Sequence, residues 1–197
     1  MGDTIRDKLL QAGIELLSRK TFSKISMDQV AESSGVSKPM IYYYFKNKEG
    51  YYKALATFLL KIARSMTRKV INTELSLREN LTNYVRFRIE FVRNNPGISK
   101  AFMSMISDPN IGLLIEEMQD EFNVMRLELI DPIFDKAKKK GEIRPETNGV
   151  MVIMMLNSVL VALSMKILNG FGINDKLNTD EIVDILFDGI SDKREDN

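Results

Sequence analysis

The stretch from Ser26 to Glu49 constrains the fold of this 197-residue chain more than any other part of the sequence. Ser26, followed three residues later by Gln29, is the pattern of a helix capping box. Gly35 suits the left-handed exit of that helix, and Ser37 is expected to cap a second helix. Two short helices joined by about three residues that include a glycine are typical of a helix-turn-helix.

The second of these helices, residues 37–45, has an unusual face. At about 100° per residue, Ile41 and Phe45 point toward the core, whereas Tyr42 and Tyr43 point toward solvent. The alternative is that residues 42–45 are simply core aromatics, but neighbouring ring positions cannot all face inward on one helix. Exposed aromatic side chains in a row indicate a binding partner.

Two lysines stand at helix starts beside these tyrosines. Lys38 opens the second helix, and Lys48 opens a third behind Asn47, which we expect to cap it. A cation at a helix N-terminus opposes the helix dipole, but it helps to bind an anion there together with the free N–H groups. Tyrosines beside phosphate-seeking lysines predict DNA binding, with residues 37–45 in the major groove.

A known family shares these features. The runs Val30-Ala31-Glu32, Gly35-Val36-Ser37-Lys38 and Tyr42-Tyr43-Tyr44-Phe45-Lys46-Asn47-Lys48-Glu49 closely resemble the signature of TetR/AcrR-type bacterial transcriptional regulators. The resemblance covers roughly the first quarter of the chain in sequence, and the rest only in length and helix pattern. Pro39 departs from the Gly or Ala that is more usual in the family, which bears on base preference rather than on the fold.

The resemblance implies a homodimeric repressor that leaves a palindromic DNA operator when a small molecule binds. The fold it implies is all-α, with an N-terminal three-helix DNA-binding domain (1–48) and a C-terminal helical ligand-binding and dimerisation domain (49–197). The residues expected to contact DNA are Ser26, Gln29, Ser37, Lys38, Tyr42, Tyr43, Tyr44 and Lys48.

Charge and composition agree with this division. Residues 1–70 hold 13 Lys and Arg against 6 Asp and Glu, a net +7, and residues 71–197 hold 15 against 21, a net −6. A basic head on an acidic body is typical of a DNA-binding domain joined to a domain that does not bind DNA. The chain has no Cys and no His, which removes the usual ligands of structural zinc, the usual general base and the thiol nucleophile. We therefore predict neither an enzyme nor a protein with a metal or cofactor.

The helical periodicity predicts about nine helices. From residue 47 a long helix links the DNA-binding head to the body, and in the family it is the lever between ligand and DNA. We expect Asn95-Pro96-Gly97 to stop the helix before it, and Pro132 to kink or restart the long element around it. The predicted helices span 4–19, 26–34, 37–45, 47–70, 76–94, 98–106, 111–140, 148–168 and 179–191.

The helix at 148–168 is the most apolar part of the chain. Its longest apolar run is short for a membrane span and contains polar residues, so we expect a buried helix, no membrane contact and a cytoplasmic protein. The helices at 148–168 and 179–191 resemble the pair through which the family dimerises. The alternative is that the apolar helix is central in the core of a monomer.

A ligand pocket is expected in the body, because the family encloses one between its long helices. Met and Phe are adaptable enough to line an apolar pocket, although at helical spacing they are equally typical of an ordinary core. The candidate lining residues are Phe87, Phe91, Met103, Phe122, Met125, Met151 and Met155. The sequence does not identify the ligand, and Asn157, Glu90 and Arg86 are the open choices for a polar contact.

Two other classes of function compete with the regulator. One is a helical small-molecule-binding or scaffold protein without operator-specific DNA binding, which leaves the basic head unexplained. The other is an enzyme that uses the acidic stretch Glu116, Glu117, Asp120 and Glu121 as a metal site. A solvated helix face is the simpler interpretation of that stretch, and neither alternative accounts for residues 26–49.

Overall fold

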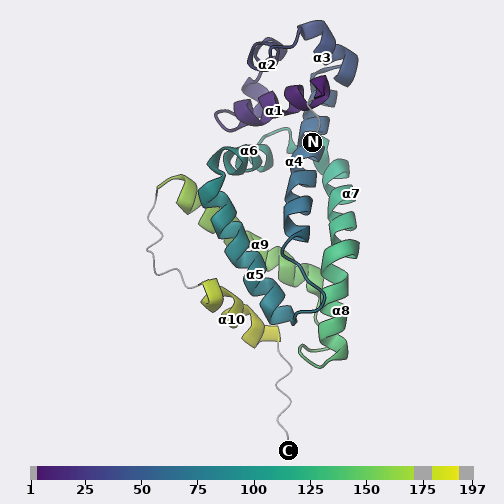
Figure 1. Cartoon of the computed structure of the whole chain (residues 1–197), viewed down its shortest axis with the longest axis vertical. Helices are drawn as coiled ribbons and strands as arrows, with labels where there is room; N and C mark the ends of the chain where they lie inside the picture. The colour runs from purple at the N-terminus through teal and green to yellow at the C-terminus, as the bar shows by residue number, and fades with distance from the viewer. Residues whose placement is uncertain (1–3, 171–178, 191–197) are drawn as a thin grey trace, which may run out of the picture. The chain divides into compact units, whose positions relative to one another are not determined.

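The structure is a computed structural model that describes residues 4–170 and 179–190 (Figure 1). Within these ranges the chain is helical and contains no β-strand. The elements are α1 (Ile5–Leu17), η1 (Phe22–Lys24), α2 (Met27–Ser34), α3 (Lys38–Phe45), α4 (Lys48–Arg68), α5 (Leu77–Asn94), α6 (Pro96–Ile106), η2 (Ile111–Leu114), α7 (Ile115–Met125), η3 (Arg126–Ile130), α8 (Asp131–Lys139), α9 (Gly149–Leu168) and α10 (Thr179–Ile190).

The segment from α7 to α8 is one continuous helix with a π-helical stretch in its middle, η3. The N–H of Asp131 donates to the carbonyl of Arg126, five residues back, and Pro132 stands in the first turn of the renewed α-helix. Proline lacks the N–H and obstructs the regular α-helical ladder, so the predicted interruption at Pro132 is confirmed. Counted as one, this element brings the described residues to nine helices, which confirms the predicted all-α fold.

Other helix boundaries differ from expectation by a few residues. The sequence predicts a break at Asn95-Pro96-Gly97 before the next helix, but α6 already begins at Pro96. Proline is tolerated at the first helical position because that N–H has no partner in the helix. Residue 191, the predicted end of the last helix, lies outside the described residues.

The described chain packs into two compact units, each with its own core. Of the described residues, the first contains 4–64 and 95–122, and the second contains 65–94, 123–170 and 179–190. In the first unit, α1, α2, α3 and the first part of α4 pack with α6, η2 and α7. Its fully buried side chains include Leu9, Leu10, Val30, Ile41, Tyr51, Tyr52, Leu55, Leu59, Met105 and Leu114.

The second unit is built around α5 and α9, with α8 and α10 packed against them. Its buried side chains include Leu77, Leu81, Val85, Ile133, Phe134, Ile143, Leu156, Leu160 and Val183. Asn80 is fully buried at the start of α5, where its amide group donates to the carbonyls of Asn72 and Ser76 and accepts from the N–H of Asn72. These bonds satisfy polar groups that would be costly to bury alone.

The apolar helix α9 is only partly covered. Val152, Ile153 and Leu156 face the core, but Met151 and Met155 are 53% and 57% exposed. By length and composition α9 could cross a membrane, a test that core helices of soluble proteins also pass, and 28% of its apolar window is buried within the chain. Much of the apolar surface of α9 therefore has no cover among the described residues. This disfavours the alternative in which the helix is central in the core of a monomer, and burial against a second copy stays a prediction.

Candidate DNA-binding surface

The helix-turn-helix begins with the predicted capping box. The Ser26 hydroxyl accepts from the N–H of Gln29 (3.2 Å), and the Gln29 side chain accepts from the N–H of Ser26 (3.1 Å). Helix α2 ends at Gly35, whose φ of 67° is left-handed. This exchange fixes both side chains against the backbone, so Ser26 and Gln29 set the start of α2. Their predicted part in DNA binding stays a prediction.

The second helix starts differently from the prediction. Ser37 occupies the N-cap position of α3, but its side chain makes no capping hydrogen bond. The carbonyl of Ser37 still accepts from the N–H groups of Met40 and Ile41. Its exposed hydroxyl therefore has no structural task in the described part of the chain.

Helix α3 separates its aromatic side chains by burial as the sequence predicts. Ile41 is fully buried, and Phe45 is 5% exposed and packs edge-on against the ring of Tyr51 at 5.1 Å. Tyr43 is 78% exposed, while Tyr42 and Tyr44 are 41% and 38% exposed. The Tyr43 and Tyr44 rings meet edge to face, with centroids 5.3 Å apart. Three tyrosine rings are thus presented on a helix that the core holds by its opposite side.

Lys38 is tied to α2 rather than extended into solvent. Its ammonium group donates to Asp28 at 3.0 Å, and this hydrogen bond raises the pKa of Lys38. The pair joins the start of α3 to the first turn of α2 across the surface. A phosphate contact by Lys38 would therefore compete with Asp28 for the ammonium group.

The junction between α3 and α4 is tightly determined. Lys46 adopts a φ of 65°, which is uncommon for a residue with a side chain. Asn47 caps α4 by accepting from the N–H of Gly50 at 2.7 Å, as predicted. A Cβ atom on Gly50 would lie 2.2 Å from the carbonyl oxygen of Phe45. The glycine therefore permits the close approach that sets the direction of α4 relative to α3.

Lys48 at the start of α4 also makes contacts within the protein. Its Nζ donates to the carbonyl of Ser23 at 3.3 Å and lies 5.0 Å from the centre of the Phe22 ring. The Phe22 ring also stacks on the ring of Tyr52, with centroids 3.8 Å apart. Lys48 is thus positioned at a partly exposed site, and the predicted phosphate contact remains a prediction.

Two residues of α6 and its exit brace the head, and no pattern in the sequence indicates them. The Ser104 hydroxyl donates to the carbonyl of Lys20 at 3.1 Å, and the carboxylate of Asp108, 2% exposed, accepts from the N–H of Ser23 at 3.4 Å. Burial raises the pKa of Tyr52, and the nearby Asp108 charge adds to the shift. The hydrogen-bonded partners lie 84 and 85 residues apart in sequence, a separation that no local pattern reveals.

The acidic stretch of α7 forms ion pairs with α4. Lys53 lies 3.5 Å from Glu117, and Arg64 lies 3.4 Å from Glu121. Among the residues the structure describes, no group of three or more acidic side chains is arranged to hold a metal ion. Two of the four carboxylates considered as metal ligands thus join helices instead.

The seven candidate pocket residues are divided between the two units. Met103 and Phe122 are half-buried members of the first unit. In the second unit, the Phe87 and Phe91 rings lie 5.8 Å apart on α5, whereas Met151 and Met155 belong to the exposed face of α9. Met125 lines a cavity in the second unit that has a volume of about 20 Å³. Their role as ligand contacts remains a prediction.

That cavity is apolar apart from one edge. Tyr84 lies at its wall and donates to the side-chain oxygen of Asn157 at 2.8 Å, and Arg88 donates to the Tyr84 hydroxyl at 3.2 Å. The cavity has room for about one water molecule, so a larger ligand requires the surrounding helices to move. Its lining is formed by Thr67, Ile71, Leu81, Tyr84, Met125, Leu129, Ile130, Ile133 and Ile153.

The head matches a known family. Residues 9–55 match the family model described as bacterial regulatory proteins, tetR family. The chain is 28% identical over 118 residues to the HTH-type transcriptional regulator RutR of Escherichia coli K12, a match that covers 59% of this chain and 54% of RutR. The chain therefore aligns with about half the length of that curated relative.

The fold extends the similarity over nearly the whole chain. A TetR-family regulator from Vibrio parahaemolyticus superimposes with a TM-score of 0.79 at 21% identity, covering 95% of this chain and 98% of that one. FadR of Bacillus subtilis, solved in complex with stearoyl-CoA, gives a TM-score of 0.72 at 15% identity, covering 92% and 95%. At these identities the similarity establishes the fold.

Proposed function

We infer that this chain, which belongs to the TetR family of bacterial regulatory proteins, is a cytoplasmic transcriptional repressor that binds a palindromic operator as a homodimer. The observation that carries the proposal is the face of α3. Its three tyrosine rings are exposed, while Ile41 and Phe45 on its opposite side anchor it in the core. A surface helix with this division can enter the major groove without disturbing the fold that carries it.

The proposed contacts divide into two kinds. Tyr43 is the most exposed ring and is the first candidate to reach base edges, with Tyr42 and Tyr44 beside it. Lys38 and Lys48 stand at helix starts, where free N–H groups add to their attraction for phosphate. Ser26, Gln29 and Ser37, at the starts of α2 and α3, are proposed to assist these contacts to DNA.

Dimerisation supplies the second half-site. We propose that the exposed apolar face of α9 packs against the same face of a second copy, with α10 beside it. Its uncovered large side chains are Met151, Met154, Met155, Val159 and Met165. A two-fold symmetric dimer then places two α3 helices for half-sites about 34–36 Å apart, one turn of DNA.

A small-molecule ligand is proposed to release the operator. The cavity beside Tyr84 is apolar, and FadR of Bacillus subtilis holds stearoyl-CoA on a similar fold. A ligand that opens this cavity would favour the arrangement of the helices that accommodates it, and thereby lower the population that fits the operator. We expect an apolar molecule with a polar end near Tyr84 and Asn157.

The first experiment measures binding of the purified protein to a fluorescent duplex from upstream of its own gene, beside a scrambled duplex of equal length. Tyr43→Ala is expected to weaken binding to the native duplex by roughly 5- to 150-fold, which corresponds to the loss of about 1–3 kcal/mol for a side chain that reads a base. Tyr43→Phe serves as the matched control that keeps the ring and removes the hydroxyl.

The outcomes separate the two classes of function. Preference for the native duplex that is lost in Tyr43→Ala supports the repressor. If the Tyr43→Ala protein still prefers the native duplex as strongly as the wild type does, Tyr43 is not one of the residues that contact the operator. A protein that binds no duplex at low salt would instead favour a helical ligand-binding protein without operator recognition.

A further inference from the structure

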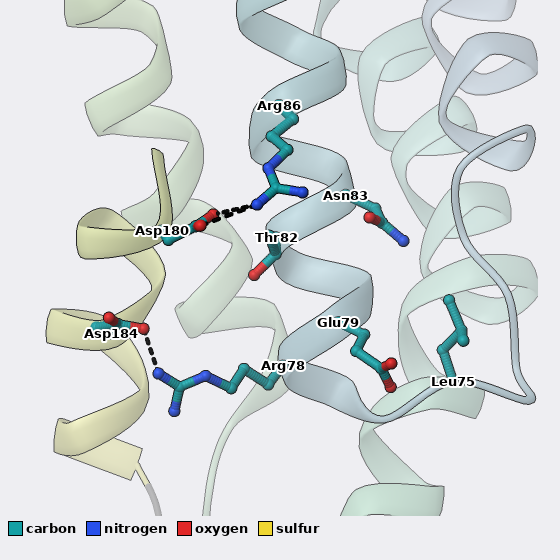
Figure 2. Close-up of a pocket in the computed structure, with 8 residues that line it drawn as sticks. All are labelled: Leu75, Arg78, Glu79, Thr82, Asn83, Arg86, Asp180 and Asp184. Atoms are coloured by element: carbon teal, nitrogen blue, oxygen red, sulfur yellow. Dashed lines mark hydrogen bonds and ion pairs between the residues drawn. The ribbon is translucent and has the colours of Figure 1, made fainter. Parts of the chain in front are cut away.

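A polar groove lies between α5 and α10, in the second unit and apart from both the apolar cavity and the exposed face of α9. Figure 2 shows Arg78 and Arg86 reaching from α5 toward Asp184 and Asp180 on α10. Its volume is about 630 Å³, within the range typical of small-molecule sites. It is lined by Leu75, Arg78, Glu79, Thr82, Asn83, Arg86, Asp180 and Asp184.

The two ion pairs that cross the groove are exposed and therefore exchangeable. One guanidinium nitrogen of Arg86 lies 2.8 Å from both carboxylate oxygens of Asp180, and Arg78 pairs with Asp184. All four side chains are about half exposed. Pairs of this kind are weak because water screens them. Another anion can take the place of either carboxylate at small cost.

The floor of the groove offers further polar groups. Thr82 and Asn83 stand between the two arginines along α5, with the Asn83 side chain on the side of the helix away from α10 (Figure 2), and neither side chain makes a hydrogen bond within the described ranges. Glu79, in contrast, is engaged by the hydroxyl and N–H of Ser76, and these bonds lower the pKa of Glu79. The groove thus offers the Thr82 hydroxyl and the Asn83 amide in addition to the two arginines. The carboxylate of Glu79, held by Ser76, adds a negative charge that limits how many negative charges a bound ligand can carry.

We propose that this groove binds a small polyanion, a polycarboxylate or a phosphorylated molecule, whose acidic groups replace Asp180 and Asp184 on Arg78 and Arg86. Thr82 and Asn83 supply hydrogen bonds to the same ligand. Binding frees the carboxylates that tie α10 to α5, although the ring of Phe187 still lies 5.5 Å from the Arg78 guanidinium carbon. If α10 belongs to the proposed dimer interface, binding of such an anion in the groove would also affect dimerisation.

The test measures binding of citrate and of inorganic pyrophosphate to the whole protein by titration calorimetry, in the absence of DNA. The double variant Asp180→Asn/Asp184→Asn removes the internal competitor, so its affinity should rise roughly three- to tenfold, in keeping with two weak surface pairs. The double variant Arg78→Gln/Arg86→Gln breaks the same pairs but should lose binding. If the ion pairs served only to hold α10 against α5, the two double variants should change the affinity for the anions in the same direction.

Net charge needs its own control, because the two double variants differ in charge. Glu116→Gln/Asp120→Asn adds the same positive charge on exposed positions of the first unit and should leave the affinity unchanged. Equal tightening in this control, or binding of neither probe to the Asp180→Asn/Asp184→Asn protein, overturns the proposal. Response to citrate alone identifies a polycarboxylate site, and response to pyrophosphate alone identifies a phosphate site. Because no operator is involved, failure here leaves the proposed repressor untouched.

Discussion

Among the glycines that the structure describes, Gly50 is the one where an added Cβ atom would meet its nearest neighbour at the shortest distance. Gly50→Ala should reduce the free energy of unfolding by about 1–3 kcal/mol, the usual cost of overpacking, because the clash is with the backbone oxygen of Phe45. This destabilisation by the added Cβ atom would have the opposite sign to helix propensity, which favours Ala over Gly by about 1 kcal/mol. Urea unfolding measures it directly.

Gly97 in the first turn of α6 provides the matched control. Nothing lies within 4 Å of a Cβ atom built there, so Gly97→Ala should leave stability unchanged or raise it slightly. Equal stability of the Gly50→Ala and wild-type proteins would mean that the α3–α4 junction relaxes easily and does not fix the direction of α3.

Lys48 combines an internal contact with the proposed phosphate contact, and the two can be separated by salt. Lys48→Ala should weaken binding to every duplex and reduce the slope of log affinity against log salt by about one. The measurement is a duplex titration at several salt concentrations. Lys61→Ala, an exposed lysine on the same helix, should change neither quantity.

If Lys48 serves only to hold Phe22 and the carbonyl of Ser23, the variant should be less stable but keep the wild-type salt slope. That result would remove Lys48 from the phosphate contacts.

At the scale of elements, helix ends that depend on local chemistry could be predicted from the sequence. The capping box of Ser26, the glycine exit at Gly35, the cap at Asn47 and the restart at Pro132 each depend on residues within one or two turns. Side-chain capping by Ser37 was predicted but is not made. The hydrogen bonds from Ser104 and Asp108 to the head could not be predicted, because they depend on which helices pack together. Helical periodicity identifies the buried face of a helix but not the element that packs against it.

The same limit applies to the candidate pocket residues, whose role stays a prediction. Helical spacing places Met151 and Met155 on the apolar side of α9, but it does not distinguish an apolar face turned toward the core from one turned outward. Both are more than half exposed, while Thr67 and Leu129, which line the cavity, were not among the candidates. Which apolar residue faces a void is a property of packing.

The exposed face of α9 leads to a prediction about assembly. Met155→Glu should convert the proposed dimer to a monomer, because a carboxylate would be buried without a partner at the centre of an apolar interface. Light scattering coupled to size-exclusion chromatography gives the mass. Leu127→Glu, at an equally exposed apolar position on η3, should remain dimeric. A wild-type monomer, or a dimer that survives Met155→Glu, would exclude α9 as the interface.

At the scale of the whole molecule, the DNA-binding helices share a core with a distant part of the chain. The first unit joins residues 4–64 to residues 95–122, and Ala101, Met105 and Leu114 are fully buried in its core. The predicted domain division at residue 48 remains a proposal about function. For stability, the head depends on α6 and η2.

A fragment of residues 1–70 should therefore fold poorly. Losing Met105 and Leu114 alone removes about 3–6 kcal/mol of apolar burial at 1.5–3 kcal/mol per side chain, from a total that is typically about 5–15 kcal/mol. Thermal unfolding monitored by circular dichroism should show a much lower, less cooperative transition than the full chain gives. A fragment that unfolds at the full-chain temperature would show that the head is autonomous.

The π-helical stretch before Pro132 also bears on the history of the chain. A ring closed over five residues contains one residue more than the α-helical ring, so loss of a single codon within 126–130 would restore the ordinary helix. It would also bring Pro132 against the carbonyl four residues before it, at a cost of about 3 kcal/mol. The additional residue and the proline therefore favour each other. Descendants or relatives that are one residue shorter at this point should have replaced the proline.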